Sequence, residues 1–574
     1  MYRMEHPRPE LIRENWVNLN GVWEFEMDVG VCYRAKGNML DKAQYAQTIQ
    51  VPFCPESKLS GIGYTDFINA VWYRRKVTIK KGDMRILLHF EASYYKTEVF
   101  VGDKSVGVHK GGYTPFTFDI TDYVVDGENV MVVYVEGDAR DRTQPSGKQS
   151  FNYQPNGCLY TRSTGIWSTV WLEYVPKTYL KAIKLDSDIY NSTLSAQLTL
   201  VGNGAKRITL TAFFDGKEVG KRELQTEDTN VFTQIELSEL KLWDTKTPNL
   251  YDLSIKVESE YGLDEAQSYF GMRSIRYDKY GLRLNGKYVY QRLVLDQGYY
   301  PDGIITAPTA EDLEKDILLS KRLGFNGARL HQKVFERRYL YYADKHGYLC
   351  WGEYPSWGFN HHIDSCVQIF LREWMEAVER DYNHPCIIGW CPLNEAREIE
   401  YKGDIAEGFR ETLYETTKRY DSNRAVIDNS DGVHKKTDIF DVHDYEDNVE
   451  LLKERYSCLG NGAYAHCPNR HFELNEHGLP FFFSEWGGTY IKENSANLYA
   501  HVENTDGLVE RFCGHMEVLF ENPEICGCCY TQLYDIEGEI NGFYYYDRTP
   551  KLTEEQADKI LTCHRRLSAS EKLR

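Results

Sequence analysis

Residues 386–398 read CIIGWCPLNEARE, and this stretch decides how the C-terminal half of the chain folds. Its short apolar run is typical of a strand that is buried on both faces, as in a parallel sheet. The run ends in Asn394 and Glu395. A carboxylate is costly to bury unless it is paired, hydrogen-bonded or used in chemistry, so this strand end is a candidate functional position.

Similar runs recur along the chain from about residue 277 and alternate with helical patterns, which favours βαβ units around a parallel sheet. Eight strand candidates fit a (β/α)₈ TIM barrel, whose active site forms at the C-terminal ends of the strands. The predicted strands are 293–296, 326–330, 348–354, 386–395, 425–430, 439–445, 480–487 and 526–535.

Two of the intervening helices have clear sequence signals. Residues 309–324 begin with Thr309 as a cap and Asp312 three residues later, and Gly324 ends the segment. In residues 367–378, apolar side chains recur at helical spacing until the His-Pro pair at 384–385 breaks the pattern. We expect both helices to lie outside the barrel.

The N-terminal half reads as two β domains. Residues 1–176 contain alternating apolar and polar runs separated by Gly, Pro and Asp turns, which predicts a β-sandwich. Residues 177–276 repeat this style in a smaller unit, which suits an immunoglobulin-like sandwich. The barrel is then expected over residues 277–574.

Composition excludes several classes of function. The net charge of -19 over 574 residues argues against nucleic acid and anionic lipid as partners. No leader or membrane span is visible, so the cytoplasm is the expected location. The CGCC run at 526–529 has no second Cys/His pair at metal-site spacing, so buried core thiols are expected and neither a metal nor another cofactor is predicted.

The ends of predicted strands four and seven carry the chemistry. Glu395 ends the fourth strand and Glu485 ends the seventh, so both should face the same mouth of the barrel. Each residue alone could be an ordinary salt-bridge partner or cap. Two carboxylates at one pocket are what glycoside hydrolysis requires, because one protonates the leaving oxygen and the other attacks the sugar or activates water.

Motifs over most of the chain resemble glycoside hydrolase family 2, which includes β-galactosidases, β-glucuronidases and β-mannosidases. They occur in both β domains and throughout the barrel, and their combination is what makes the resemblance specific. The motifs are VPFCPESKLSGI (51–62), GGYTPFTFDIT (111–121), CLYTRSTGIWSTVWLE (158–173), FGMRSI (270–275), LVLDQGYYPDG (293–303), GFNGARLHQKVFERRYLYYADKHGYLCWGEYPSWG (324–358), NHPCIIGWCPLNEA (383–396) and YTQLYDIEGEINGFYYYDRTPK (530–551).

The resemblance implies that the first domain is a jelly roll. It also implies roles for three residues at the ends of predicted strands four and seven. Glu395 matches the general acid/base, Asn394 matches the donor to the sugar 2-hydroxyl, and Glu485 matches the nucleophile. The implied reaction is double displacement with net retention by an exo-acting β-glycosidase on a terminal sugar. Family members often form homo-oligomers, but no interface can be identified from this sequence.

Other residues near the predicted strand ends are candidates for binding a carbohydrate substrate or orienting the Glu pair, with salt bridges and caps as the alternative. Among the aromatic residues Trp357, Trp390, Trp486 and Tyr534, only Trp486 is preferred as a platform for a sugar ring. The candidate substrate-binding residues are Asp296, Arg329, His331, His443, Tyr445 and Trp486.

Two departures from the family bear on the substrate. Many relatives have Ser-Trp-Gly after the acid/base, where this chain has Ala396-Arg397-Glu398, so the aglycone preference is open. The β-glucuronidases hold the sugar carboxylate with an Asn-x-Lys motif, where this chain has Glu539, Ile540 and Asn541. A neutral-sugar, β-galactosidase-like enzyme is therefore preferred. The alternatives are a β-hexuronidase that uses Arg397 and a non-catalytic carbohydrate-binding protein.

Overall fold

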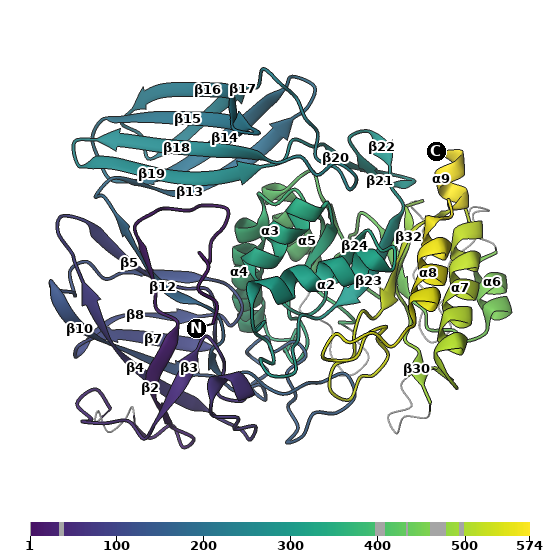
Figure 1. Ribbon diagram of the computed structural model, residues 1–574, viewed down its shortest axis with the longest axis horizontal. Helices are drawn as coiled ribbons and strands as arrows, with labels where there is room; N and C mark the ends of the chain where they lie inside the picture. The colour runs from purple at the N-terminus through teal and green to yellow at the C-terminus, as the bar shows by residue number, and fades with distance from the viewer. Residues whose placement is uncertain are drawn as a thin grey trace.

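The structure is a computed structural model that describes residues 2–33, 39–396, 408–431, 434–457, 459, 478–492 and 499–574. It contains two β-sandwiches and a barrel of parallel strands (Figure 1). In that view the first sandwich lies at the lower left, the second at the top and the barrel at the right. No helix in the described ranges is long and apolar enough to cross a membrane.

The first sandwich encloses its own apolar core between two main sheets. A short pair, β6 (Ser93–Tyr94) and β11 (Gly165–Ile166), lies beside them. One main sheet has the order β1 (Trp16–Asn18), β12 (Val170–Val175), β5 (Arg85–Phe90), β9 (Phe116–Asp119). The other has the order β3 (Gln47–Val51), β2 (Gly21–Met27), β4 (Ala70–Ile79), β10 (Gly127–Glu136), β7 (Lys96–Val101), β8 (Lys104–Lys110).

The second sandwich shows strand alternation clearly. In β17 (Asn230–Glu236) every second residue is buried, because successive side chains of a strand point to opposite faces. β17 pairs in one sheet with β14 (Thr193–Val201), which also pairs with β13 (Tyr179–Asp188). The second sheet has the order β16 (Lys217–Thr226), β15 (Lys206–Phe214), β18 (Tyr251–Ser259), β19 (Gly262–Phe270).

The barrel confirms the eight predicted strands, which lie in one sheet in sequential order around the barrel. A small antiparallel sheet leads into it, formed by β20 (Ile275–Asp278), β21 (Gly281–Leu284) and β22 (Lys287–Tyr288). The barrel strands are β23 (Gln291–Asp296), β24 (Gly327–Leu330), β25 (Leu349–Glu353), β26 (Ile387–Cys391), β27 (Ala425–Val426), β28 (Phe440–His443), β29 (Phe481–Gly487) and β32 (Ile525–Thr531).

Glycines allow two barrel strands to pack large aromatic rings against each other. A Cβ on Gly389 of β26 would meet the Trp351 ring of β25 at 2.4 Å. A Cβ on Gly352 of β25 would meet the Trp390 ring of β26 at 2.7 Å. Both tryptophans are fully buried. In each strand a glycine thus makes room for the tryptophan of the other strand. Trp390 therefore belongs to the core.

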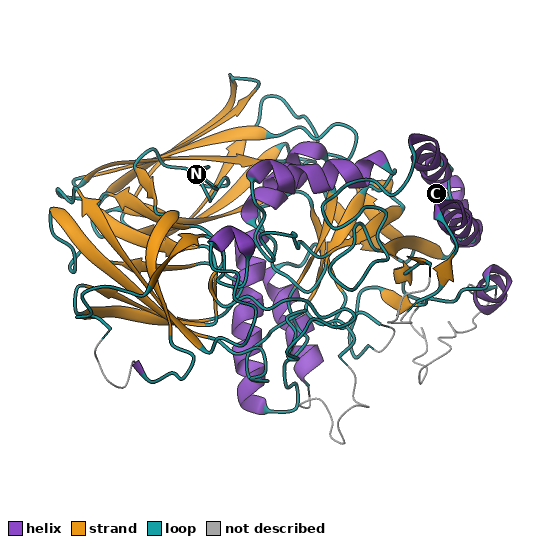
Figure 2. Ribbon diagram, turned by 60° about the horizontal axis from the view of Figure 1, so that its bottom comes forward, coloured by secondary structure: helices purple, strands orange, loops and turns teal. Residues whose placement is uncertain are grey.

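Helices follow most of the barrel strands and lie outside them (Figure 2). The predicted capping box at Thr309 is present, and the two predicted helices are α2 and α4. The described residues between β27 and β28 form no helix, which departs from a strict (β/α)₈ pattern. The helices are α2 (Ala310–Arg322), α3 (Arg337–His346), α4 (Asp364–Asp381), α5 (Phe409–Tyr420), α6 (Val449–Tyr456), α7 (Thr505–Glu521), α8 (Glu554–Arg565) and α9 (Ala569–Leu573).

The cysteines meet the expectation of core thiols. Those in the CGCC run are buried, as are Cys350, Cys386 and Cys391. All cysteines in the described ranges are free. Burial raises the pKa of these six thiols, which keeps them in the neutral form that suits a core.

Candidate active site

The structure brings Glu395 and Glu485 together at the barrel mouth. Glu395 follows β26 and adopts a left-handed backbone with φ 51°, held by its N–H donating to the Ser430 carbonyl at 2.9 Å. Glu485 lies within β29. One carboxylate oxygen of each glutamate and a ring nitrogen of His443 all lie within 4.8 Å of one another. Two strands that are distant in sequence therefore supply a close carboxylate pair.

His443 joins the two carboxylates. Its Nδ1 lies 2.8 Å from Glu395 Oε1, and its Nε2 lies 3.5 Å from Glu485 Oε1. Burial by itself lowers the pKa of His443, but Glu485 and Glu395 raise it above the ordinary histidine value. In its protonated form the imidazole can donate from Nδ1 to Glu395 Oε1, while Nε2 lies 3.0 Å from Ser430 Oγ.

Arg329 connects several side chains around the carboxylate pair. Its guanidinium donates to Glu485 Oε1 at 3.2 Å and to Asn394 Oδ1 at 3.0 Å. It also donates to the Ser484 carbonyl at 2.7 Å and to Glu353 at 2.6 Å. Arg329 is buried. One fork of donors therefore fixes the nucleophile candidate and the neighbouring asparagine in a single arrangement.

Asn394 keeps a donor available. Its Oδ1 accepts from Arg329, and its backbone N–H donates to Ser356 Oγ at 3.1 Å. Its Nδ2 is buried and has no hydrogen-bond partner among the described residues. Since buried amide donors are normally satisfied, this group is suited to bind an atom that enters the pocket.

Tyr445 and His331 belong to the same hydrogen-bond network. The Tyr445 hydroxyl donates to Glu485 Oε2, so both oxygens of that carboxylate have a donor. His331 lies 2.9 Å from Glu353 Oε2 through its Nδ1. Burial lowers the pKa of His331, which favours the neutral imidazole.

Glu353 is a site residue that the sequence analysis did not identify. It ends β25 and binds both Arg329 and His331. Burial alone raises the pKa of this carboxyl, but the two partners bring the pKa down to about 2. The signal was present in the sequence, because Glu353 follows an apolar run in the same way as Glu395.

Asp296 lies at its predicted strand end, but both of its carboxylate oxygens already accept hydrogen bonds from the protein. Its Oδ1 accepts from Tyr534 Oη and from the Gly298 N–H, and its Oδ2 accepts from Tyr339 Oη at 3.1 Å. Burial and the neighbouring Asp316 raise the pKa of Asp296 to about 6. These contacts make it a positioning residue for the loop that follows β23.

Trp486 does not reach the pocket, contrary to the expectation from sequence. It follows Glu485 directly, so its side chain points to the opposite face of β29. Its ring packs against Phe512 and His515 of α7, at centroid distances of 5.3 and 6.1 Å. Trp486 is therefore part of the layer between the barrel and its helices.

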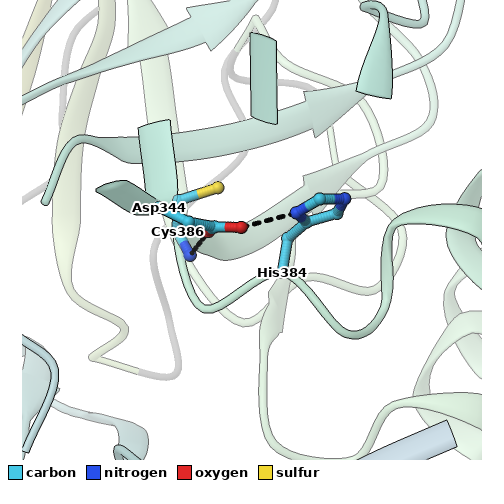
Figure 3. Close-up of side chains that lie close together, drawn as sticks. All are labelled: Asp344, His384 and Cys386. Carbon is cyan, nitrogen blue, oxygen red and sulfur yellow. Dashed lines mark hydrogen bonds and ion pairs between the residues drawn. The ribbon is translucent and has the colours of Figure 1, made fainter. Parts of the chain in front are cut away.

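A second cluster of potential metal ligands has a structural explanation. Asp344, His384 and Cys386 lie together, and the Asp344 carboxylate binds His384 Nδ1 at 2.6 Å and the Cys386 N–H at 2.8 Å (Figure 3). The same carboxylate accepts from Tyr269 Oη at 2.9 Å. Both oxygens are therefore occupied in a joint between the second sandwich and the barrel.

Three successive parts of the chain match three parts of one protein family. Residues 17–154 match the sugar binding domain of glycosyl hydrolases family 2, residues 178–273 match a second domain of the same family, and residues 305–553 match its TIM barrel domain. The chain belongs to glycosyl hydrolase family 2. Members of family 2 are glycoside hydrolases.

Its relatives in family 2 carry two different activities in their names. The chain is 28% identical over 443 residues to a β-galactosidase of Thermoanaerobacterium thermosulfurigenes, which covers 72% of this chain but 57% of that protein. It is 21% identical to a β-glucuronidase of Streptococcus agalactiae over 94% of each chain. It thus spans little more than half the length of the first of these relatives.

Solved structures of family 2 share the fold. A β-glucuronidase from Ruminococcus gnavus in complex with D-glucuronic acid aligns with a TM-score of 0.78 and 18% identity, covering 97% of this chain and 100% of that one. A Bacteroides uniformis β-glucuronidase aligns with a TM-score of 0.76 and 22% identity, covering 93% of this chain and 68% of that one. The three-domain architecture predicted from the sequence is thereby confirmed.

Proposed function

We propose that this protein is a retaining, exo-acting β-glycosidase. The observation that carries the proposal is that one carboxylate oxygen of Glu395 lies within 4.8 Å of one carboxylate oxygen of Glu485. Carboxyl groups of retaining glycosidases are about 5–5.5 Å apart, whereas inverting enzymes need about 6.5–9.5 Å to admit a water molecule. The separation therefore favours direct attack by one carboxylate on the sugar.

In the proposed reaction, Glu395 in its acid form protonates the glycosidic oxygen while Glu485 attacks the anomeric carbon. The bond from the anomeric carbon to the leaving oxygen breaks as the bond to Glu485 forms, which gives a covalent glycosyl-enzyme. Glu395, now a carboxylate, then removes a proton from water. The water oxygen attacks the anomeric carbon, and Glu485 leaves, with net retention of configuration.

The surrounding side chains suit this division of roles. Donors from Arg329 and Tyr445 fix both oxygens of Glu485, the proposed nucleophile. His443 is the hydrogen-bond partner of Glu395. It can therefore stay hydrogen-bonded to Glu395 as Glu395 loses and regains its proton during the cycle. The free Asn394 Nδ2 donor is proposed to bind the sugar 2-hydroxyl, a contact that strengthens in the transition state.

A neutral, galactoside-like sugar is the preferred glycone. Glu539 stands where the glucuronidases have the Asn of their Asn-x-Lys motif, and its buried carboxylate accepts hydrogen bonds from Tyr160 Oη and Gln297 Nε2. A sugar carboxylate at this place would meet a like charge. Arg397, the basis of the hexuronidase alternative, lies outside the described residues.

The test is a panel of nitrophenyl β-glycosides covering galactoside, glucuronide, mannoside, glucoside and galacturonide. We expect turnover of the galactoside by the wild type and loss of turnover in Glu485→Ala, with folding intact. Glu395→Gln should be slow on poor leaving groups and less impaired on activated ones, because an activated aglycone needs less protonation. Turnover of a hexuronide alone would contradict the preferred glycone, and silence in every assay would favour a carbohydrate-binding protein.

A further inference from the structure

A loop of the first sandwich reaches into the mouth of the barrel. Between β10 and β11, the backbone N–H groups of Ser146 and Gly147 donate to the Trp357 carbonyl at 3.2 and 3.0 Å. Trp357 belongs to the loop that follows β25. The carbonyl of Ser146 also accepts from Tyr113 Oη at 2.8 Å, which anchors the loop to its own domain.

Gly147 shows how close this approach is. It has φ +60°, and a Cβ there would meet the Gln332 carbonyl oxygen at 2.7 Å and Pro355 Cβ at 2.8 Å. Only glycine allows the loop to lie this close to the barrel without displacement of its neighbours. The loop is therefore fitted to the barrel surface, and the next residue, Lys148, is delivered at a fixed position.

Lys148 is a mostly buried residue whose ammonium has no protein acceptor among the described residues. The residue is only 4% exposed, and Nζ lies 3.8 Å from the centroid of the Trp357 ring. Within the described part of the chain, this ammonium makes neither a hydrogen bond nor an ion pair. An ammonium in a mostly buried residue with no protein acceptor can donate to an acceptor on a bound ligand.

The electrostatic field of the pocket keeps Lys148 charged. Burial by itself lowers the pKa of Lys148, but the proximity of Cys158 and of the Glu539, Glu485 and Glu395 carboxylates raises it above the ordinary value. These carboxylates are close enough to favour the charged form of Lys148. The stacking on Trp357 adds a cation–π contact that holds the ammonium in place.

Lys148 is linked to Asn394 through the Trp357 ring. Trp357 Nε1 donates to the Asn394 carbonyl at 3.1 Å, so the ring under the ammonium is fixed to the residue proposed to bind the 2-hydroxyl. Lys148 thus lies on the Asn394 side of the pocket. The sugar oxygen next to the 2-hydroxyl is the 3-hydroxyl, whereas the C5 substituent lies across the ring.

We infer that Lys148 is a substrate-binding residue, which donates to the 3-hydroxyl of the glycone from the first sandwich. The inference rests on the proposed function, because it takes the orientation of the sugar from Asn394. It assigns to the site a terminal sugar with a free 3-hydroxyl.

The test compares Lys148→Met and wild type on three substrates: the nitrophenyl β-glycoside hydrolysed fastest in the panel, its 3-deoxy analogue and its 6-deoxy analogue. We expect Lys148→Met to lower kcat/KM about 10- to 100-fold on the parent and 6-deoxy substrates, the range for a hydrogen bond from a charged donor. On the 3-deoxy substrate, the two proteins should agree within about threefold, because the acceptor is already missing.

Equal losses on all three substrates, or no loss on the parent, would overturn the inference. Lys148→Gln is a second variant that keeps a shorter donor and guards against a folding defect in Lys148→Met. Lys104→Met, an exposed lysine of the same domain, is the matched control and should behave as wild type. Labelling of Glu485 by a 2-deoxy-2-fluoroglycosyl fluoride distinguishes failure of the Lys148 inference from failure of the proposed function. A wild type that is neither labelled nor active would overturn the proposed function itself.

Discussion

At the scale of single residues, the site depends on a few side chains with several partners each. Arg329 contacts Glu353, Glu485 and Asn394 at once. A planar guanidinium can do this because its donors form a rigid fork, whereas a lysine ammonium is a single point charge. The arrangement of the nucleophile candidate therefore depends on an arginine that is not expected to touch the reacting atoms.

We predict that Arg329→Lys lowers kcat by about 100-fold, because a small misplacement of Glu485 and Asn394 has effects of this size. The measurement is steady-state kinetics on the preferred nitrophenyl glycoside. Arg424→Lys is a matched control, since Arg424 is also buried and binds Asp421 at 2.7 Å, away from the pocket. Comparable losses of kcat in both variants would indicate a general folding defect in place of a positioning role.

At the scale of elements, the barrel is closed differently between β27 and β28 than elsewhere. These two strands stand at the ends of the sheet order, so no backbone ladder joins them. The Val426 carbonyl accepts from the Asp438 N–H at 2.9 Å, and His434 bridges Asp428 and Asp441 at 2.8 and 3.1 Å. Charged side chains thus replace part of the missing ladder.

The His434 bridge should make stability depend on pH. Burial by itself lowers the pKa of His434, but hydrogen bonds and charge from Asp428 and Asp441 raise it from 6.5 to about 10. Because the folded-state pKa is the higher one, the bridge contributes fully below pH 6.5 and its contribution is lost as the pH rises toward 10. We predict that His434→Gln lowers the free energy of unfolding by about 3–5 kcal/mol at pH 6.

Urea unfolding of wild type and His434→Gln at pH 6 and pH 9 checks this prediction. The difference in free energy between the two proteins should be clearly smaller at pH 9. His346→Gln is a suitable control, because His346 pairs with Glu314 at the half-exposed surface and should cost under about 1 kcal/mol. A difference that is independent of pH would show that the bridge does not depend on the charge of His434.

At the scale of the whole molecule, the two sandwiches are attached to the barrel by specific buried contacts. Trp243 of the second sandwich is fully buried, and its Nε1 donates to the Asp344 carbonyl at 2.7 Å. Tyr160 of the first sandwich donates to Glu539 of the barrel. Because of these contacts, we expect the domains to unfold together.

We predict that Trp243→Ala separates the unfolding of the second sandwich from that of the barrel. The change removes a large buried side chain at the joint and should cost about 3–5 kcal/mol. Calorimetry should then show an additional transition at lower temperature. Tyr190→Ala, in the same sandwich but 84% exposed, should leave the profile unchanged. A single transition at a uniformly lower temperature would instead mean that the domains remain coupled through other contacts.

The sequence by itself determined the eight barrel strands, helices α2 and α4 and the position of the Glu pair. These features depend on local periodicity, caps and the rule that parallel strands end on one side of a sheet, all of which can be read along the chain. The match to glycosyl hydrolase family 2 then confirmed the three-domain fold. The domain boundaries remain predictions.

Only the tertiary structure decided which neighbouring side chains face the pocket. Trp486 packs against Phe512 and His515 of α7, a helix that the sequence does not place beside it. Glu353 acquires its place through Arg329, and Lys148 arrives from a different domain across almost 250 residues from Glu395. Contacts of this kind depend on how separate units dock, and no local pattern of residues records that docking.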